Sequence, residues 1–164
     1  MDDLLIVLTC IAPLAIHLLA TRGRGDRRAA YACVGLGLAF LYFAAGHFAV
    51  TDELVVMLPS WLPARKPLIL ATGVLELLIA IGLLGLFGPR LRPAACIAAA
   101  LVLVLFLPAN VYAALHHVGV GQHKLGPVYL LVRIPLQVFL FAWACWPLRW
   151  PDPAASRPHR GIWH

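Results

Sequence analysis

The stretch Ala71-Thr72-Gly73-Val74-Leu75-Glu76-Leu77-Leu78-Ile79-Ala80 places a carboxylic acid near the middle of an apolar run. The run is about 20 residues long, which is enough to cross a bilayer as a helix. An ionisable residue at that depth costs roughly 2.5–3.5 kcal/mol on insertion scales, so it should face protein or water rather than lipid. Thr72, Gly73 and Ala80 share a helix face with Glu76 and are small, so another helix can approach the acid closely.

The composition of the whole chain predicts an integral membrane protein. Of its 164 residues, 62% are hydrophobic and 12% are charged, whereas a soluble domain carries about 25% charged residues. The mean hydropathy is +0.88. The net charge of +6 lies in loops and tail, so we interpret it as a topology signal and expect no nucleic-acid partner.

Five apolar runs predict five membrane spans in one all-α bundle. The expected spans are residues 4–20, 29–50, 68–87, 94–115 and 128–146. The first run is at the lower limit of length for a span, so a four-span bundle with this run on the surface remains the alternative. Residues 1–150 would form a single transmembrane bundle, and residues 151–164 a mobile cytoplasmic tail.

The basic residues predict the orientation of the bundle. The segments that would be cytoplasmic hold nine arginines, and the outer loops hold three basic residues, Arg65, Lys66 and Lys124. This bias predicts a multi-pass protein of the inner (plasma) membrane with its N-terminus outside and its C-terminus in the cytoplasm. The acidic start Met1-Asp2-Asp3 argues against a cleavable signal peptide.

Prolines and cysteines add local expectations. The segment 51–67 is rich in proline and cannot form a continuous helix. Its Trp61 suits the membrane interface, where the segment would act as a lid over the bundle. Pro108 and Pro135 should break or bend the fourth and fifth spans. The four cysteines form no CxxC motif, so we expect small buried hydrophobes rather than a close thiol pair.

Strongly polar side chains of four spans lie at a similar depth. At helical rise, His47 lies about 5 Å below the outer edge, Glu76 about 12 Å, and Asn110 and Arg133 about 8 Å. Gln137 is one turn deeper than Arg133 on the same face. We therefore predict an inward cluster in which Arg133 pairs with Glu76 and keeps it ionised, while the other three complete the hydrogen bonds.

This cluster has a functional and a structural interpretation. If the cluster only held four helices together, it would add little to the stability of the bundle, because polar contacts between helices average about 0.6 kcal/mol in membranes. A functional cavity is therefore favoured, because intramembrane ionisable groups mark functional sites. The candidate catalytic residues are Glu76 and His47. The candidate ligand-binding residues are Asn110, Arg133, Gln137, Trp61 and Tyr112.

The remaining histidines are interpreted as ordinary residues. His17 lies alone at the opposite depth and should be a satisfied core or interface histidine. His116, His117 and His123 lie in a loop and have ligand types suited to zinc or copper. Their spacing matches no standard metal motif, so no metal site is predicted.

Four short motifs resemble those of DoxX-like membrane proteins. They are the Thr72–Leu77 segment followed by Ile81–Leu84, the Leu107–Tyr112 segment (LPANVY, similar to FPANIYM), the Leu58–Pro63 segment (LPSWLP, similar to PPWLP) and the Arg133–Gln137 segment (RIPLQ). The motifs occur in the family's order. The resemblance implies a four-helix unit over roughly residues 29–146, to which the first span is an addition.

The resemblance also implies a redox-linked role near the quinone pool. DoxX-like relatives include the membrane subunit of a thiosulfate:quinone oxidoreductase and a component linked to oxidative-stress defence. More distant relatives act in cofactor maturation or membrane-protein assembly. This chain has no thiol-pair motif and no obvious haem, flavin or iron–sulfur motif, so it should not carry electrons alone.

Three functions follow from these observations. The first is a membrane subunit that binds a lipophilic, quinone-like molecule, with Arg133, Gln137 and Asn110 on its carbonyl groups and Glu76 or His47 passing protons. The second is a proton-transfer enzyme, of isomerase or cyclase type, on a lipid-soluble substrate. The third is a non-enzymatic assembly or interaction protein. The expected partners are the lipid bilayer, a lipophilic small molecule and another membrane or redox protein.

Overall fold

The computed structural model describes residues 2–21, 27–118 and 126–149, and this part of the chain is helical without a strand. Its helices are α1 (Asp2–Ala20), α2 (Arg28–Ala49), α3 (Thr51–Val55), α4 (Arg65–Leu84), α5 (Arg92–Leu115) and α6 (Leu130–Cys145), with 3-10 turns at Pro89–Leu91 and Trp146–Arg149. Five helical segments within the described residues are long and apolar enough to cross a membrane. The prediction of an all-α, membrane-compatible chain is confirmed, and the predicted tail lies outside the described residues.

The third span begins and ends three residues earlier than predicted. Ala64 has a φ of 52° and stops the preceding turn, and α4 begins at Arg65. Pro67 therefore lies in the first turn of α4, where its missing N–H has no helical acceptor to lose. At the other end Gly85, with a φ of 77°, closes the helix, as a glycine in the left-handed region commonly does.

The expectation that proline interrupts the fourth span was wrong. Helix α5 continues through Pro108, and α6 continues through Pro135 in the same way. Each proline removes one backbone donor, but the flanking turns and the neighbouring helices hold the helix together. The predicted break of the proline-rich segment is confirmed, because only the five-residue α3 is α-helical between α2 and α4.

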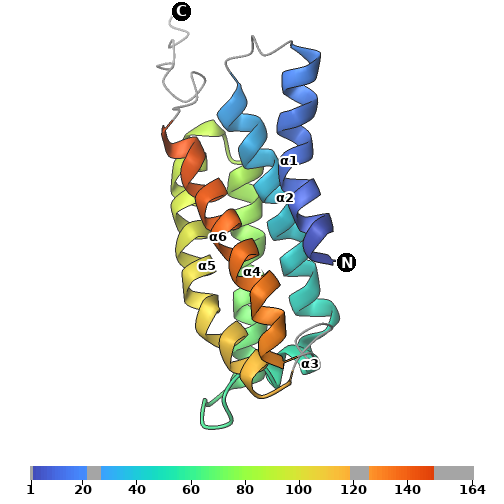
Figure 1. The fold of residues 1–164 in the computed structure, drawn as a ribbon. Coiled ribbons are helices and arrows are strands. Elements are labelled where there is room, and N and C mark those ends of the chain that lie inside the picture. Colours follow the sequence, from blue (N-terminus) through green and yellow to red (C-terminus); the bar gives the residue numbers. More distant parts are fainter. Residues whose placement is uncertain (1, 22–26, 119–125, 150–164) are drawn as a thin grey trace, which may run out of the picture.

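The long helices form one bundle in which α2 packs closely against both α4 and α1, while α5 packs against α6 and α4. Figure 1 shows α3 at one end, next to the end of α5 and the start of α6. We call this the α3 end. The opposite end carries the end of α1, the start of α2 and the end of α6. Because the helices alternate in direction, α2 and α5 end at the α3 end, and α4 and α6 begin there.

The interior of the bundle is apolar and the outside is apolar as well. The side chains that are largest and fully buried are Phe40, Leu36, Leu83, Leu140, Cys10, Cys33 and Cys96. Large apolar residues are also exposed along the bundle, among them Leu19, Leu101, Leu105 and Leu131. Such a surface suits lipid rather than water. The buried polar residues among those described are His17, Glu76, Asn110 and Gln137, and three of these four belong to the predicted cluster.

Candidate functional site

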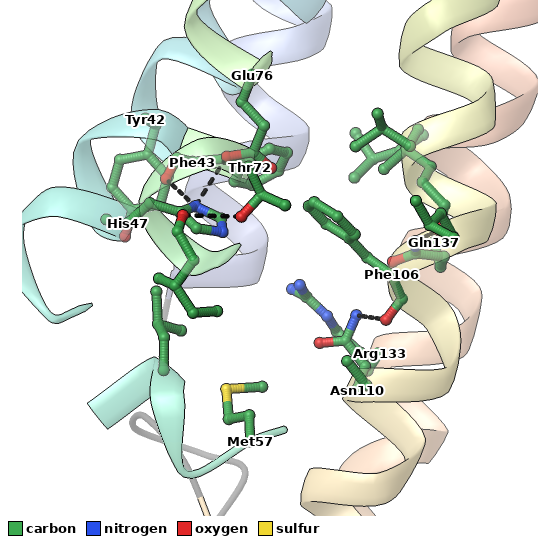
Figure 2. Close-up of a pocket in the computed structure, with 18 of the residues that line it drawn as sticks. Tyr42, Phe43, His47, Met57, Thr72, Glu76, Phe106, Asn110, Arg133 and Gln137 are labelled. Carbon is green, nitrogen blue, oxygen red and sulfur yellow. Dashed lines mark hydrogen bonds and ion pairs between the residues drawn. The ribbon is translucent and has the colours of Figure 1, made fainter. Parts of the chain in front are cut away.

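A cavity of about 420 Å³ lies at the α3 end of the bundle, with walls from five of its helices and a cap from α3 and the turn after it. Its lining is mostly apolar. The structure brings all five residues of the predicted cluster to this cavity, and they are His47, Glu76, Asn110, Arg133 and Gln137. Figure 2 shows His47 and Glu76 on one wall and Asn110, Arg133 and Gln137 on the wall opposite.

The first wall is built on a close contact between α2 and α4. Gly73 permits this contact, because a Cβ atom there would lie 2.7 Å from the Cβ of His47. Nδ1 of His47 lies 2.9 Å from Oε2 of Glu76. The Glu76 side chain is only 3% exposed. The imidazole is therefore the polar partner of a carboxyl group that the helix bundle has almost completely removed from solvent.

The same nitrogen of His47 also lies 3.1 Å from the carbonyl oxygen of Phe43. A carbonyl oxygen can only accept a hydrogen bond, so Nδ1 carries a proton. When His47 is neutral, its Nε2 atom is then an unprotonated acceptor. Within the described part of the chain Nε2 has no hydrogen-bond partner, and His47 lines the cavity. In that neutral state the ring contacts Glu76 and Phe43 through Nδ1 and has an acceptor nitrogen at Nε2.

The predicted pairing of Arg133 with Glu76 was wrong. Glu76 pairs with His47, and Nη1 of Arg133 lies 3.7 Å from Oδ1 of Asp3 on α1. The hydroxyl of Tyr129 also donates to Oδ1 of Asp3, at 3.4 Å. Arg133 and Glu76 share a depth, but they face the cavity from different walls (Figure 2), and the first turn of α1 supplies the nearer carboxylate.

The side-chain amides of Asn110 and Gln137, in the second wall, both donate to backbone carbonyls of α5. Nδ2 of Asn110 donates to the Phe106 carbonyl one turn earlier in α5, at 3.0 Å. Nε2 of Gln137 crosses from α6 to the Leu103 carbonyl of α5. Both amide nitrogens therefore donate to backbone carbonyls of α5, which fixes the position of each side chain in the second wall. Gln137 acts first as a link between α5 and α6.

Trp61 and Tyr112, the other predicted ligand residues, do not line the cavity. The Trp61 side chain is 79% exposed in the turn after α3. The Tyr112 ring stacks on His116, with 4.0 Å between ring centroids. The cap over the cavity comes instead from apolar side chains of α3 and the turn that follows, Leu54, Met57 and Leu58. Their apolar character in a proline-rich segment was the only sequence signal for this role.

Asp3 and Tyr129 are cavity residues that the sequence reasoning missed. Asp3 was interpreted only as part of an acidic chain start, and Tyr129 lies just before α6. The sequence signal for Asp3 was a carboxylate in the first turn of a predicted membrane span. Helix α1 packs tightly on α2 at Gly35. A Cβ atom at Gly35 would lie 2.0 Å from the carbonyl oxygen of Cys10 in α1.

The other histidines and the cysteines lie elsewhere. His17 is buried at the opposite end and stacks on Tyr31 at 4.2 Å. Among the described residues no three His, Cys, Asp or Glu side chains are grouped as a metal site, and His123 lies outside those residues. Contrary to the expectation from spacing, two cysteines are close: Sγ of Cys33 and Sγ of Cys96 are 3.6 Å apart between α2 and α5.

Comparison with known proteins identifies a family for most of this bundle. Residues 36–148, more than half of the chain, match a family described as a domain of unknown function, DUF8561. No curated protein and no solved structure matches the chain. The matched region contains all five residues of the predicted cluster, but not Asp3 of α1.

Proposed function

The chain belongs to the DUF8561 family, whose function is unknown, and we propose that it is a membrane protein that binds a lipophilic, quinone-like molecule as a redox-linked membrane subunit. The observation that carries this proposal is the convergence of five polar residues on one mostly apolar cavity of about 420 Å³. Pockets for small ligands typically measure about 300–1,000 Å³ and combine an apolar lining with a few placed polar groups.

Each wall of the cavity offers a different chemistry to a dicarbonyl ring. Arg133 provides N–H donors for one carbonyl oxygen, since its side chain lines the cavity and a guanidinium carries five N–H groups. His47 faces the same space from the other wall and accepts a proton at Nε2 when a quinol hydroxyl is bound there. Its Nδ1–H donates to the Phe43 carbonyl, and Oε2 of Glu76 lies 2.9 Å from the same nitrogen. A redox partner protein would exchange the electrons.

A second candidate function is proton transfer without redox change, as in an isomerase or cyclase acting on a lipid-soluble substrate. The contact of 2.9 Å between His47 and Glu76 favours it, because a histidine oriented by a carboxylate is a common general base. In this case a substrate proton would pass to Nε2 of His47 and return at another atom of the same substrate. Turnover without a redox partner distinguishes this function from the first.

The likeness to DoxX-like proteins and the distribution of arginines complete the proposal. The arginines support a bundle with its N-terminus outside, so that the α3 end and the cavity lie in the outer half of the membrane. A ligand would then be exchanged with the outer leaflet. Labelling of a single cysteine introduced at Ser60, in the turn after α3, by a membrane-impermeant maleimide on intact cells tests this orientation. Protection of that cysteine until the cells are opened would contradict it.

The test of the ligand is native mass spectrometry with lipid extraction on detergent-purified protein, comparing wild type with Glu76→Gln and Glu53→Gln. Glu53 lies in α3, is exposed and is not in the cavity lining, so its variant controls for the loss of one charge. We expect a co-purifying apolar molecule in wild type and Glu53→Gln that is lost in a folded Glu76→Gln. If wild type carries no such molecule and Glu76→Gln only lowers the melting temperature, the cluster is structural, as an assembly or interaction protein would require.

A further inference from the structure

Asp3 gives the cavity a charge balance that the family-matched region does not contain. Its carboxylate lies 3.7 Å from Nη1 of Arg133 and accepts a hydrogen bond of 3.4 Å from Tyr129. The side chains of Asp3 and Arg133 are 16% and 20% exposed, so both are largely removed from solvent. Helix α1 lies outside the matched residues 36–148. This chain therefore places a counter-ion in the cavity from a helix that the matched region does not include.

We infer that Asp3 is a specificity-determining residue that makes the cavity select an electrically neutral amphiphile with carbonyl acceptors over an anionic amphiphile of similar size. The inference rests on the proposed function, because it names the class of ligand that the same cavity accepts. The inference concerns the head group of the ligand: the head group of the anionic amphiphile carries one negative charge, and that of the neutral amphiphile carries none.

The charges of the lining residues support this choice. Among the described residues, the Asp, Glu, Arg, Lys and His side chains that line the cavity are Asp3, His47, Glu76 and Arg133. They form two pairs, His47 with Glu76 and Arg133 with Asp3. Their sum is zero when His47 is protonated and −1 when it is neutral. With both carboxylates ionised, the cavity carries no net positive charge in either state that an anion could balance.

The low dielectric of a membrane interior makes that sum decisive. Electrostatic energies are several-fold larger there than in water, so an unbalanced charge is strongly disfavoured. A carboxylate ligand would bring the lining and ligand together to −1 or −2. A carbonyl oxygen brings no charge, and it can still accept from the guanidinium N–H groups of Arg133, whose side chain lines the cavity.

Removal of the Asp3 charge should reverse the preference. Asp3→Asn keeps the shape of the side chain and leaves Arg133 without its counter-ion, so the lining becomes more positive by one charge. We expect the affinity for an anionic amphiphile to rise at least about tenfold, while the affinity for a neutral one changes much less. In the double variant Asp3→Asn/Arg133→Gln the charge is balanced again, and the gain in anion affinity should disappear.

The experiment measures the binding of two probes to the purified full chain in a zwitterionic detergent at neutral pH. The neutral probe is a decyl-substituted 1,4-benzoquinone, and the anionic probe is laurate. The proteins are wild type, Asp3→Asn, the double variant and Tyr129→Phe. The Tyr129→Phe variant removes the hydrogen bond to Asp3 but no charge. Glu53→Gln again controls for a charge lost outside the cavity, and melting temperatures show that each variant is folded.

The outcomes separate this inference from the proposed function. Quinone binding by wild type with laurate binding gained only in Asp3→Asn supports both. Quinone binding by wild type without a gain of laurate binding in Asp3→Asn overturns the role of Asp3 alone. The same gain in Tyr129→Phe or in the double variant would also overturn it, because packing and not charge would then set the preference. Absence of quinone binding in wild type overturns the proposed function itself.

Discussion

Nδ1 of His47 lies 2.9 Å from Oε2 of Glu76, and this contact joins α2 to α4 at the α3 end of the bundle. The two residues are 29 positions apart in sequence and on different helices. Their approach depends on Gly73, whose missing side chain leaves room for the Cβ of His47. A small residue near an intramembrane acid thus lets a second helix bring a histidine within bonding distance.

Gly73→Ala should separate α2 from α4 at this contact. The new methyl group would lie 2.7 Å from the Cβ of His47, which is closer than packed carbon atoms can approach. We expect a loss of about 1–3 kcal/mol in the free energy of unfolding from overpacking, together with weaker ligand binding. Thermal unfolding in detergent measures the first effect.

Gly46→Ala is the matched control for that substitution. A Cβ at Gly46 meets nothing within 4 Å, and alanine is favoured over glycine inside a helix by roughly 0.5–1 kcal/mol. This variant should melt at the same temperature as wild type or higher. Equal destabilisation by Gly73→Ala and Gly46→Ala would contradict the close contact of α2 and α4 at His47.

Gly35→Ala should displace α1 from the bundle. A Cβ at Gly35 would lie 2.0 Å from the carbonyl oxygen of Cys10, and a backbone atom cannot move aside as a flexible side chain can. Because α1 carries Asp3, the variant should lose stability and also show the laurate binding of Asp3→Asn. Unchanged stability and probe preference would show that α1 does not pack on α2 as described.

Gln137→Leu tests whether the amide of Gln137 serves structure or ligand. Its Nε2 atom donates to the Leu103 carbonyl between α6 and α5, so the substitution should lower the unfolding free energy by about 0.5–2 kcal/mol. Ligand affinity should change less than about threefold, or ~0.6 kcal/mol. Val138→Leu, at a surface position next to it, should change neither quantity. Loss of binding without loss of stability would instead place Gln137 on the ligand.

Oxidation of the protein by iodine tests the packing of α2 against α5. Sγ of Cys33 and Sγ of Cys96 are 3.6 Å apart, so one equivalent of iodine should join them in a disulfide with release of two equivalents of hydrogen iodide. Mass spectrometry of the intact chain and its peptides would show the loss of two hydrogen atoms. Cys10→Ser should behave as wild type, and Cys33→Ser should prevent the link. A link involving Cys10 would place α2 and α5 differently.

The amino-acid sequence determined which runs are long and apolar enough to span a membrane and where the polar residues lie along them. Apolar runs of sufficient length predict membrane-spanning helices because the bilayer thickness and the helical rise set their size. The same rise predicts depths for His47, Glu76, Asn110 and Arg133 that differ by no more than about 7 Å. The structure accordingly brings these side chains, with Gln137, to one cavity.

The tertiary structure alone decided which residues meet at that level. Periodicity along one helix gives depth and face, but the rotation of each helix relative to its neighbours depends on the packing of all of them. Glu76 therefore contacts His47 rather than Arg133, and Arg133 contacts Asp3 on α1. The same packing brings Cys33 to Cys96 and leaves Trp61 outside the cavity, because close approach of helices selects partners that no spacing in a single run encodes.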